Sequence, residues 1–251
     1  MRAATGDRPR EVADGVFGLG TRWVNFHLVV DGRAAILVDA GYPRYTGQLD
    51  AALAALGRRL SDVAAVIVTH HHVDHAGTAA YMRTAGAIVY VMERDAPIVR
   101  GERPSHPPAG FYRQAWRPSM LRYLGHTVRS GGARYAACED VHVLEGDQAL
   151  DLPGRPTVIA TPGHTAGHCS VALPDRGVLL AGDAMVNFDY ASGARGLRLH
   201  RFNEDHEAAR RSLARFEDLD ADTVLFGHGD PWTNGVSRAL AAIRDRSLGS
   251  R

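Results

Sequence analysis

The feature that most constrains this sequence is a set of short apolar runs that each lead to a potential metal ligand. The run 64–69 is rich in β-branched residues and stops directly before His70, His71 and His72. Short runs of this composition are typical of buried β-strands. Three later runs behave similarly, with 157–160 before His164, 178–181 before Asp183 and 223–226 before His228. Strand ends lying side by side in a sheet would form a rigid platform on which these side chains converge.

The segment 70–75 reads His-His-His-Val-Asp-His and holds the densest group of ligand-type residues. Side chains alternate along an extended segment, so His70 and His72 should point to one side and His71 to the other. Asp74 and His75 follow where the chain turns into the next predicted helix, within reach of a second ion. A lone histidine or aspartate is more often structural, but this spacing indicates a metal site.

The donor set indicates the kind of metal site. The candidate ligands offer imidazole nitrogen or carboxylate oxygen and no thiolate; they are His70, His72, Asp74, His75, His164, Asp183 and His228. Such a set matches catalytic rather than structural zinc, and it exceeds what one tetrahedral ion needs. The sequence therefore predicts two catalytic ions. The alternative zinc motif HExxH does not occur in the sequence.

The hydrophobic pattern predicts a mixed α/β protein. Strands are expected at 16–19, 24–30, 34–38, 64–69, 87–91, 141–144, 157–160, 169–173, 178–181 and 223–226. Helices are expected at 49–60, 77–84, 93–99, 207–216 and 236–244. Because the sequence shows neither a linker nor an internal repeat, the simplest organisation is a single domain over 1–251.

A helical insertion is predicted at about 101–137, where prolines interrupt an aromatic-rich pattern. Pro118 cannot sit inside a helix, so two short helices are expected, with Pro118 starting the second. The insertion is expected to form a lid over the metal site, although packing as scaffold fits the pattern equally well. In the lid interpretation, rings supply apolar contact and a guanidinium can hold a substrate carboxylate. The candidate substrate-binding residues are Arg113, Trp116, Arg117 and, outside the insertion, Tyr190.

Composition limits the partners and the location. The formal net charge is +1, which gives no argument for nucleic acid or an anionic membrane as a partner. No run approaches the length of a membrane span, and 1–11 lacks the apolar stretch of a secretory signal. Cys138 and Cys169 cannot form a disulfide framework, which fits a reducing compartment. We therefore expect a soluble cytoplasmic protein that acts on a small molecule, in an oligomeric state that the sequence does not define.

The motif HxHxDH at 70–75, followed in order by His164, Asp183 and His228, resembles the metallo-β-lactamase fold superfamily. The resemblance implies an α/β (α+β) fold, a four-layer αββα sandwich with the metal site at one edge. It implies one metal ion bound by His70, His72 and His164 and a second bound by Asp74, His75 and His228, with Asp183 bridging both. The segment 37–41 matches the family's first motif, whose aspartate, here Asp39, orients a ligand histidine.

The resemblance also implies a hydrolase that uses two Zn²⁺ ions, with other divalent metals possible. Water that bridges two such ions loses a proton near neutral pH, so a metal-bridging hydroxide is the expected nucleophile. Asp74 and Asp183 are expected to hold this hydroxide in line, which makes them the catalytic residues. The expected scissile bond is an ester, a thioester or a lactone.

Within the superfamily, this ligand set is most similar to that of glyoxalase II-like and lactonase-like members. Glyoxalase II enzymes carry a long helical extension, whereas a short segment follows His228 here, which argues against glutathione thioesters. Lactonases place a tyrosine three residues after the bridging aspartate, where this chain has Val186; Tyr190 is the nearest substitute. β-Lactamases commonly differ at the positions of Asp183 or His75, so antibiotic hydrolysis is disfavoured.

Two other classes stay open on the resemblance. Persulfide dioxygenases of this fold bind a single iron with part of the same motif, and they are the main alternative. Some nucleases of the superfamily also share HxHxDH. The near-neutral charge and the absence of an added nucleic-acid-binding domain argue against a nuclease.

Overall fold

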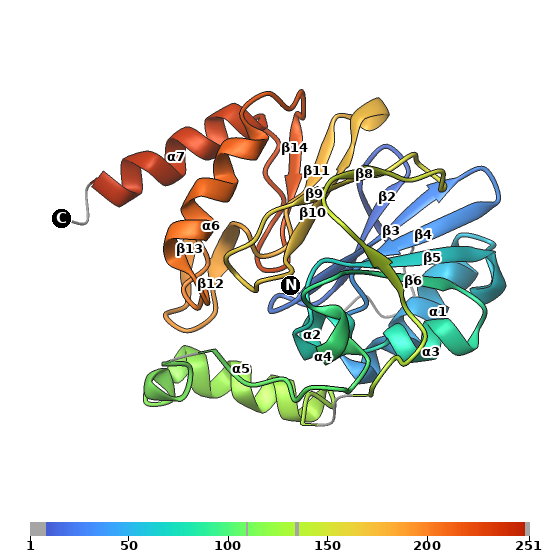
Figure 1. Ribbon diagram of the computed structural model, residues 1–251, viewed down its shortest axis with the longest axis horizontal. Coiled ribbons are helices and arrows are strands. Elements are labelled where there is room, and N and C mark those ends of the chain that lie inside the picture. Colours follow the sequence, from blue (N-terminus) through green and yellow to red (C-terminus); the bar gives the residue numbers. More distant parts are fainter. Residues whose placement is uncertain (1–8, 109, 134–135, 249–251) are drawn as a thin grey trace.

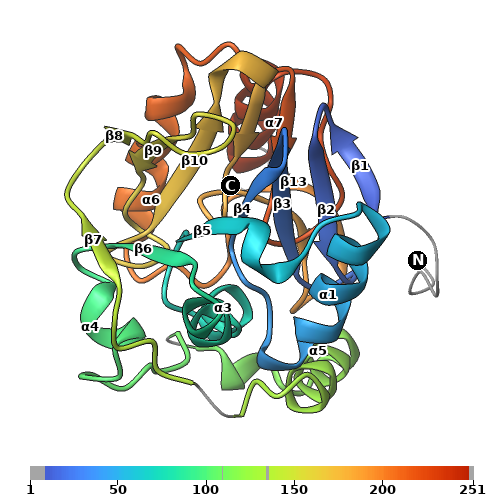
Figure 2. The same ribbon diagram turned by 90° about the vertical axis from the view of Figure 1, so that its right-hand side faces the viewer.

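Two β-sheets face each other between two layers of helices in the computed structural model, which describes residues 9–108, 110–133 and 136–248 (Figures 1 and 2). Within these ranges the first sheet has seven strands in the order β1-β2-β3-β4-β5-β6-β7. They are β1 (Arg10–Ala13), β2 (Val16–Gly20), β3 (Asn25–Asp31), β4 (Ala34–Val38), β5 (Val63–Val68), β6 (Ile88–Met92) and β7 (His142–Leu144). The second sheet follows the order β14-β11-β10-β9-β8. Its strands are β8 (Gln148–Ala149), β9 (Thr157–Ala160), β10 (Cys169–Leu173), β11 (Val178–Leu180) and β14 (Thr223–Leu225).

Helices cover the outer face of each sheet (Figure 2). Those over the first sheet are α1 (Thr46–Ala55), α2 (Val73–Ala76), α3 (Ala79–Thr84) and α4 (Ala96–Val99). Those over the second sheet are α6 (His206–Ser212) and α7 (Val236–Leu248). At one end of the sandwich lie α5 (Pro118–Arg129) and a hairpin of β12 (Val186–Asp189) and β13 (Ala194–Arg198) (Figure 1). Short 3-10 helices occur at Pro43–Tyr45, Leu60–Asp62, Tyr112–Gln114, Pro174–Arg176 and Leu213–Phe216. The predicted αββα sandwich is confirmed.

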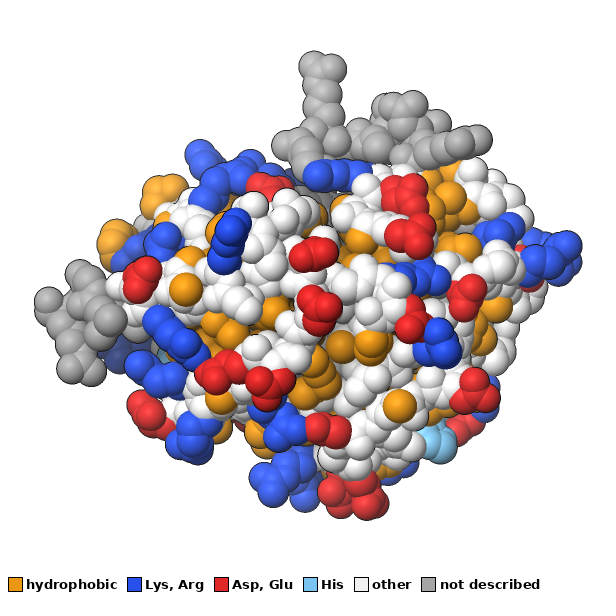
Figure 3. All heavy atoms as spheres, turned by 90° about the horizontal axis from the view of Figure 1, so that it is seen from above, with side chains coloured by type: hydrophobic (Ala, Val, Ile, Leu, Met, Phe, Trp, Pro, Cys, Tyr) orange, Lys and Arg blue, Asp and Glu red, His pale blue; other side chains and the backbone are white. Residues whose placement is uncertain are grey.

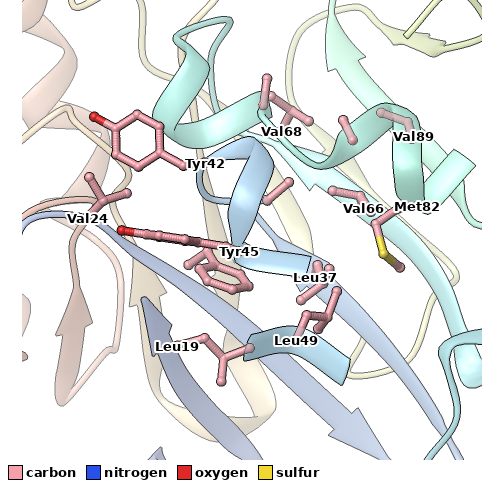
Figure 4. Close-up of a cluster of buried hydrophobic side chains, with 14 of the residues drawn as sticks. Leu19, Val24, Leu37, Tyr42, Tyr45, Leu49, Val66, Val68, Met82 and Val89 are labelled. Carbon is pink, nitrogen blue, oxygen red and sulfur yellow. The ribbon is translucent and has the colours of Figure 1, made fainter. Parts of the chain in front are cut away.

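Three clusters of buried side chains mark the three contacts between the four layers. The first lies between the first sheet and its helices and includes Leu37, Leu49 and Met82 (Figure 4). The second fills the space between the two sheets. The third lies beneath α6 and α7, where Phe216 and Leu240 pack against the second sheet. Each layer therefore buries apolar surface against its neighbour, which is the main driving force for this arrangement.

Adjacent residues of the central strands serve different layers. In β4, Ile36 belongs to the cluster between the sheets and Leu37 to the cluster under the helices. In β11, Leu180 lies between the sheets and Leu179 lies under α6 and α7. Both faces of these strands are buried, which explains why the sequence shows continuous apolar runs rather than alternation.

Strand direction brings the ends of the apolar runs together. In the first sheet β4, β5 and β6 are parallel, so their C-terminal ends lie at one edge. In the second sheet β14 is parallel to β11, and β9 and β11 are each antiparallel to β10. It follows that β9, β11 and β14 run in the same direction and also end at one edge. The predicted metal ligands come directly after these strand ends.

Four strands lie where the sequence analysis predicts none, namely β1, β8, β12 and β13. The strand β1 is at the edge of its sheet and leaves Arg10 and Glu11 exposed, so it needs no apolar run. The strands β12 and β13 pair only with each other among the described residues. The strands β8, β12 and β13 have two, four and five residues, and such short strands leave a weak sequence signal.

The predicted helix 49–60 is wrong at its C-terminal end, because α1 stops at Ala55. Gly57 adopts a φ of 66°, a left-handed conformation that ends helices at low cost for glycine. The N–H groups of Gly57 and Arg58 donate to the carbonyls of Ala54 and Leu53, at 3.0 and 2.8 Å. These bonds satisfy the last turn and redirect the chain toward β5.

The predicted start of a helix at Pro118 agrees with α5, which begins at that residue. Met120 and Tyr123 on one side of α5 are buried and belong to the cluster under the helices of the first sheet. Leu121 and Val128 on its other side are exposed. This part of the predicted insertion therefore packs against the sandwich.

The surface carries mixed charge on the face seen in Figure 3, where arginine and acidic side chains are interspersed. In the described ranges, the structure contains no helix with the length and apolar character needed to cross a membrane.

Replacement of Ile67 by alanine should lower the free energy of unfolding by about 2–5 kcal/mol, because it opens a cavity between the two sheets. Ile67 lies in β5 and is fully buried. The matched control is Ile88→Ala in the neighbouring strand β6, where the side chain is 46% exposed. Urea unfolding of both variants at equal metal content is the measurement. Equal losses of stability would contradict the proposed position of the core.

Candidate metal centre

The predicted ligands converge from both sheets at the edge where their strands end. The loop after β5 carries His70 and His72, and α2 carries Asp74 and His75. The loops after β9, β11 and β14 carry His164, Asp183 and His228. Except for the partly exposed His72, all of these side chains are buried. The fold therefore brings all the predicted ligands together.

The first group of donors consists of His70, His72 and His164, whose nearest ligand atoms lie within 4.8 Å of one another. His164 Nε2 is 3.0 Å from His72 Nδ1. The opposite nitrogen of His164, Nδ1, lies 3.3 Å from Asn203 Oδ1, so Asn203 favours the tautomer that leaves Nε2 free to bind a metal.

The second group consists of Asp74, His75 and His228, also within 4.8 Å of one another. Asp183 lies between the two groups. Its Oδ1 is 3.8 Å from His75 Nε2, and its Oδ2 is 3.1 Å from His228 Nε2 and 3.5 Å from His164 Nε2. Asp183 is thus positioned as a shared carboxylate, as the resemblance implies.

A network centred on Asp39 orients two of the histidines. His75 Nδ1 donates to Asp39 Oδ2 at 2.7 Å, which leaves His75 Nε2 facing the other donors. Thr69 donates to Asp39 through both its backbone N–H and its hydroxyl, at 2.8 and 3.0 Å. Because the Thr69 hydroxyl proton is used in this way, its oxygen can accept from His70 Nδ1 at 3.0 Å. Asp39 adopts a φ of 63°, an uncommon conformation for a residue other than glycine that often marks functional sites.

Two other residues hold the ligand loops. His168 Nε2 accepts the backbone N–H of Asp183 at 2.9 Å, and its Nδ1 lies 2.9 Å from Thr161 Oγ1. His168 is therefore a hydrogen-bonding group next to a strand end. His228 Nδ1 donates to the carbonyl of Trp23, which directs His228 Nε2 into the site.

The His71 ring contacts the ring of His72, with centroids 4.8 Å apart, but it belongs to neither donor group and its partner is Asp95, in accord with the predicted alternation. Its Nδ1 is 3.1 Å from Asp95 Oδ2, and its backbone N–H donates to the same oxygen at 2.9 Å. Asp95 also accepts from the Thr165 hydroxyl and the Gly167 N–H, both at 2.8 Å. His71 thus contacts the carboxylate that holds the loop after His164.

The two donor groups differ in charge. Burial lowers the pKa of His72 to about 3 and holds the pKa values of His70 and His164 well below the usual value. Burial also opposes a charge on His75, but the carboxylates of Asp39, Asp183 and Asp74 outweigh it and raise the pKa of His75 to about 10. The imidazoles of the first group are therefore neutral. In the second group His75 keeps a proton among carboxylates, and a bound cation would replace that proton.

Several potential metal-binding atoms at the centre have no hydrogen-bond partner among the described residues. His70 Nε2, His75 Nε2 and Asp183 Oδ1 are buried and lack any hydrogen-bond partner in the part of the chain that the structure describes. Buried polar atoms are normally satisfied, because an unpaired one costs free energy. Imidazole and carboxylate donors arranged in this way fit divalent metal ions such as zinc.

Comparison with known proteins agrees with this geometry. A family model described as the metallo-beta-lactamase superfamily matches residues 20–228. The chain belongs to this superfamily.

Its relatives include the probable metallo-hydrolase YflN of Bacillus subtilis, 31% identical over 238 residues, which cover 89% of this chain and 87% of the relative. A hydroxyacylglutathione hydrolase of Rhizobium meliloti is 28% identical over 179 residues, covering 70% of this chain and 52% of that enzyme. A metallo-beta-lactamase family protein of Thermus thermophilus, TTHA1429, has a similar crystal structure, with a TM-score of 0.69 and 27% identity. The alignment covers 95% of this chain and 81% of that protein.

Two residues of this metallo-β-lactamase superfamily site were not predicted as site residues. The Tyr123 hydroxyl, on α5, donates to Asp74 Oδ2 at 2.9 Å. His200, after β13, accepts the Phe202 N–H at Nδ1, so its Nε2 carries the proton, 3.5 Å from Asp183 Oδ2. Both follow from tertiary packing, since neither residue lies in a motif or directly after a predicted strand.

The predicted substrate-binding residues fall into two groups. Tyr190 is buried, stacks on Tyr123 with ring centroids 3.9 Å apart, and lies 4.9 Å from the ring of His228. In contrast, Trp116 is 73% exposed, and Arg117 lies over its ring. Arg113, Trp116 and Arg117 form no hydrogen bond, ion pair or ring contact with the predicted ligands in the described ranges. Their role in recognition stays a prediction.

The different partners of His71 and His72 predict different results for two alanine variants. His72→Ala should lower metal affinity at least about tenfold, because it removes a donor of the first group. His71→Ala should retain most of the bound metal, because its ring faces Asp95. Metal content after dialysis against a weak chelator is the measurement, with circular dichroism as a check on folding. Equal metal loss in two folded variants would contradict the assignment.

Proposed function

We propose that this protein is a dinuclear zinc-dependent hydrolase that cleaves an ester, thioester or lactone bond of a small molecule. The observation that carries the proposal is the pair of donor groups joined by the shared carboxylate of Asp183, with buried donor atoms that lack partners among the described residues. The proposal includes the expectation of a cytoplasmic enzyme organised as one domain.

The broader class follows from the comparisons. The superfamily match, together with relatives named as a metallo-hydrolase and a hydroxyacylglutathione hydrolase, makes the chain a metal-dependent hydrolase. The number of metal ions, their identity and the bond cleaved are the parts that we propose.

The residues that would hold the metals follow from the two donor groups. His70, His72 and His164 would bind one ion, Asp74, His75 and His228 would bind the other, and Asp183 would bind both. When bound, two zinc ions would supply Lewis acidity for the substrate carbonyl and lower the pKa of water.

Protein groups around Asp74 have a role of their own. The Tyr123 hydroxyl occupies one side of the Asp74 carboxylate, and the Tyr42 hydroxyl lies 3.2 Å from that of Tyr123. This chain of hydroxyls fixes the orientation of Asp74 from the side of α5. The same oxygen, Asp74 Oδ2, lies 3.8 Å from His75 Nε2 and 3.7 Å from His228 Nε2, so the carboxylate faces the second donor group, where it can accept a proton from the attacking water.

The surroundings favour a carbonyl substrate with an apolar part. Among the predicted ligands only His72 is partly exposed, so a substrate can approach the site past His72. Phe111 packs against Phe202 and Tyr190, with ring centroids 5.4 and 6.5 Å apart, and Tyr190 reaches His200. These rings form an apolar wall near the metal donors, and such walls commonly line small-molecule sites. Thioester hydrolysis by the named hydroxyacylglutathione relative is consistent with this choice.

Metal analysis and a substrate panel test the proposal together. The purified protein should contain two zinc ions per chain and hydrolyse at least one thioester, lactone or ester far faster than β-lactams or phosphodiesters. Chelation should abolish the activity and added zinc should restore it. A single tightly bound iron under metal-replete conditions would overturn the proposal and favour the persulfide dioxygenase alternative.

Removal of the Tyr123 hydroxyl should weaken the site without unfolding it. Tyr123→Phe keeps the ring that stacks on Tyr190 but removes the donor to Asp74, so kcat/KM or metal affinity should fall about 10–100-fold. The control is Tyr112→Phe in the same insertion, since Tyr112 is 67% exposed. Chelator competition and steady-state kinetics are the measurements. Identical behaviour of the two variants would show that Tyr123 has no role at the site.

A further inference from the structure

A cavity of about 680 Å³ lies beside the metal centre, at the open end of the sandwich. Its walls come from β1, β2, the β12–β13 hairpin, the start of α5 and the loop 229–231. Figure 1 shows α5 below the β12–β13 hairpin, and the Ser119 hydroxyl joins them by donating to the carbonyl of Tyr190 at 2.8 Å. The predicted metal ligands do not line this cavity, so it is distinct from the site described above.

The cavity is rich in positive charge. Arg10, Arg22 and Arg122 line it and form no ion pair within the described ranges. Arg195 also lines it and pairs with Asp230 at 2.6 Å, so the one acidic side chain of the lining is already neutralised. Positively charged side chains gathered around a concave surface repel one another and attract an anion.

A buried histidine forms part of the lining. His27 lies in β3 between Phe26 and Leu28, which both point into the cluster under the helices, so its ring faces the opposite side of the sheet. His27 is 6% exposed, yet its ring forms no hydrogen bond with any described residue. A buried ring with a free donor and acceptor that lines a cavity indicates a missing partner.

The N-terminus of α5 also favours an anion in this cavity. Pro118 and Ser119, in the first turn of this twelve-residue helix, line the cavity. The N-terminus of a helix carries partial positive charge and free N–H groups, which favour a bound anion.

We propose that this cavity binds a small organic anion with two acidic groups, such as carboxylates, sulfonates or phosphates. The volume lies in the range that accommodates small-molecule ligands. The arginines would form charge-assisted hydrogen bonds with the acidic groups, and His27 would contact the body of the ligand. Binding does not require the proposed hydrolysis, so it can be tested separately.

Residues that line the cavity also contact the segments that hold the metal ligand His228. Asn25 lines the cavity and donates through Nδ2 to the carbonyls of Phe226 and Gly229, on either side of His228. Phe188 also lines it and packs on Trp23, whose carbonyl accepts from His228. The bound anion is therefore either a distal group of the substrate or a separate ligand next to His228.

Calorimetric titration of the metal-loaded protein with benzene-1,3-disulfonate tests the proposal, because sulfonates coordinate metals weakly. We expect saturable binding of one molecule per chain that weakens as salt is added. Arg22→Gln and Arg122→Gln should each weaken binding at least about tenfold. The control Arg33→Gln, at the turn between β3 and β4, should bind within about twofold of the parent. The uncharged analogue 1,3-bis(methylsulfonyl)benzene should not bind.

The proposal is overturned if no saturable binding occurs up to about 10 mM disulfonate, or if Arg22→Gln and Arg122→Gln bind as Arg33→Gln does. A further comparison identifies the source of the anion. If the two variants raise KM for a carboxylate-bearing ester but not for an uncharged one, the cavity holds the substrate's own acidic group. If KM is unchanged for both esters while disulfonate binding is lost, the cavity holds a separate ligand.

Discussion

The burial of many donor atoms in one small volume is the constraint on which this site depends. His70, His75, His164, Asp183 and His228 are almost fully inaccessible to solvent, and three of their ligand atoms have no partner within the described ranges. Removing such groups from water costs several kilocalories per mole each unless hydrogen bonds or ions replace the lost hydration. Divalent cations at the centre would supply that replacement. The surrounding residues hold the Nδ1 atoms of these histidines by hydrogen bonds, so that their Nε2 atoms stay available to bind metal.

The direction of the strands determines where these donors meet. Parallel pairing of β4 with β5 places Asp39 beside Thr69, and the two residues share hydrogen bonds. The same pairing fixes the position of His75, which donates to Asp39 across the ends of the two strands. On the second sheet, the common direction of β11 and β14 places Asp183 next to His228. The two halves of the site are therefore consequences of sheet topology.

Much of this could be predicted from the sequence. The continuous apolar runs predict buried strands, and the ligand that follows each run predicts the site at the strand ends. Alternation within 70–72 predicts the opposite directions of His71 and His72, which the contact between His71 and Asp95 supports. The parts that could not be predicted depend on tertiary contacts. Tyr123 reaches Asp74 because α5 packs on the first sheet, and His200 reaches Asp183 because the β12–β13 hairpin folds back.

The central claim is that two metal ions occupy the two donor groups on either side of Asp183. Anomalous diffraction from crystals of the zinc-loaded protein, recorded above and below the zinc absorption edge, tests it most directly. We predict two peaks per chain, one among His70, His72 and His164 and the other among Asp74, His75 and His228. A single peak at full zinc saturation, or peaks away from these side chains, would contradict the account.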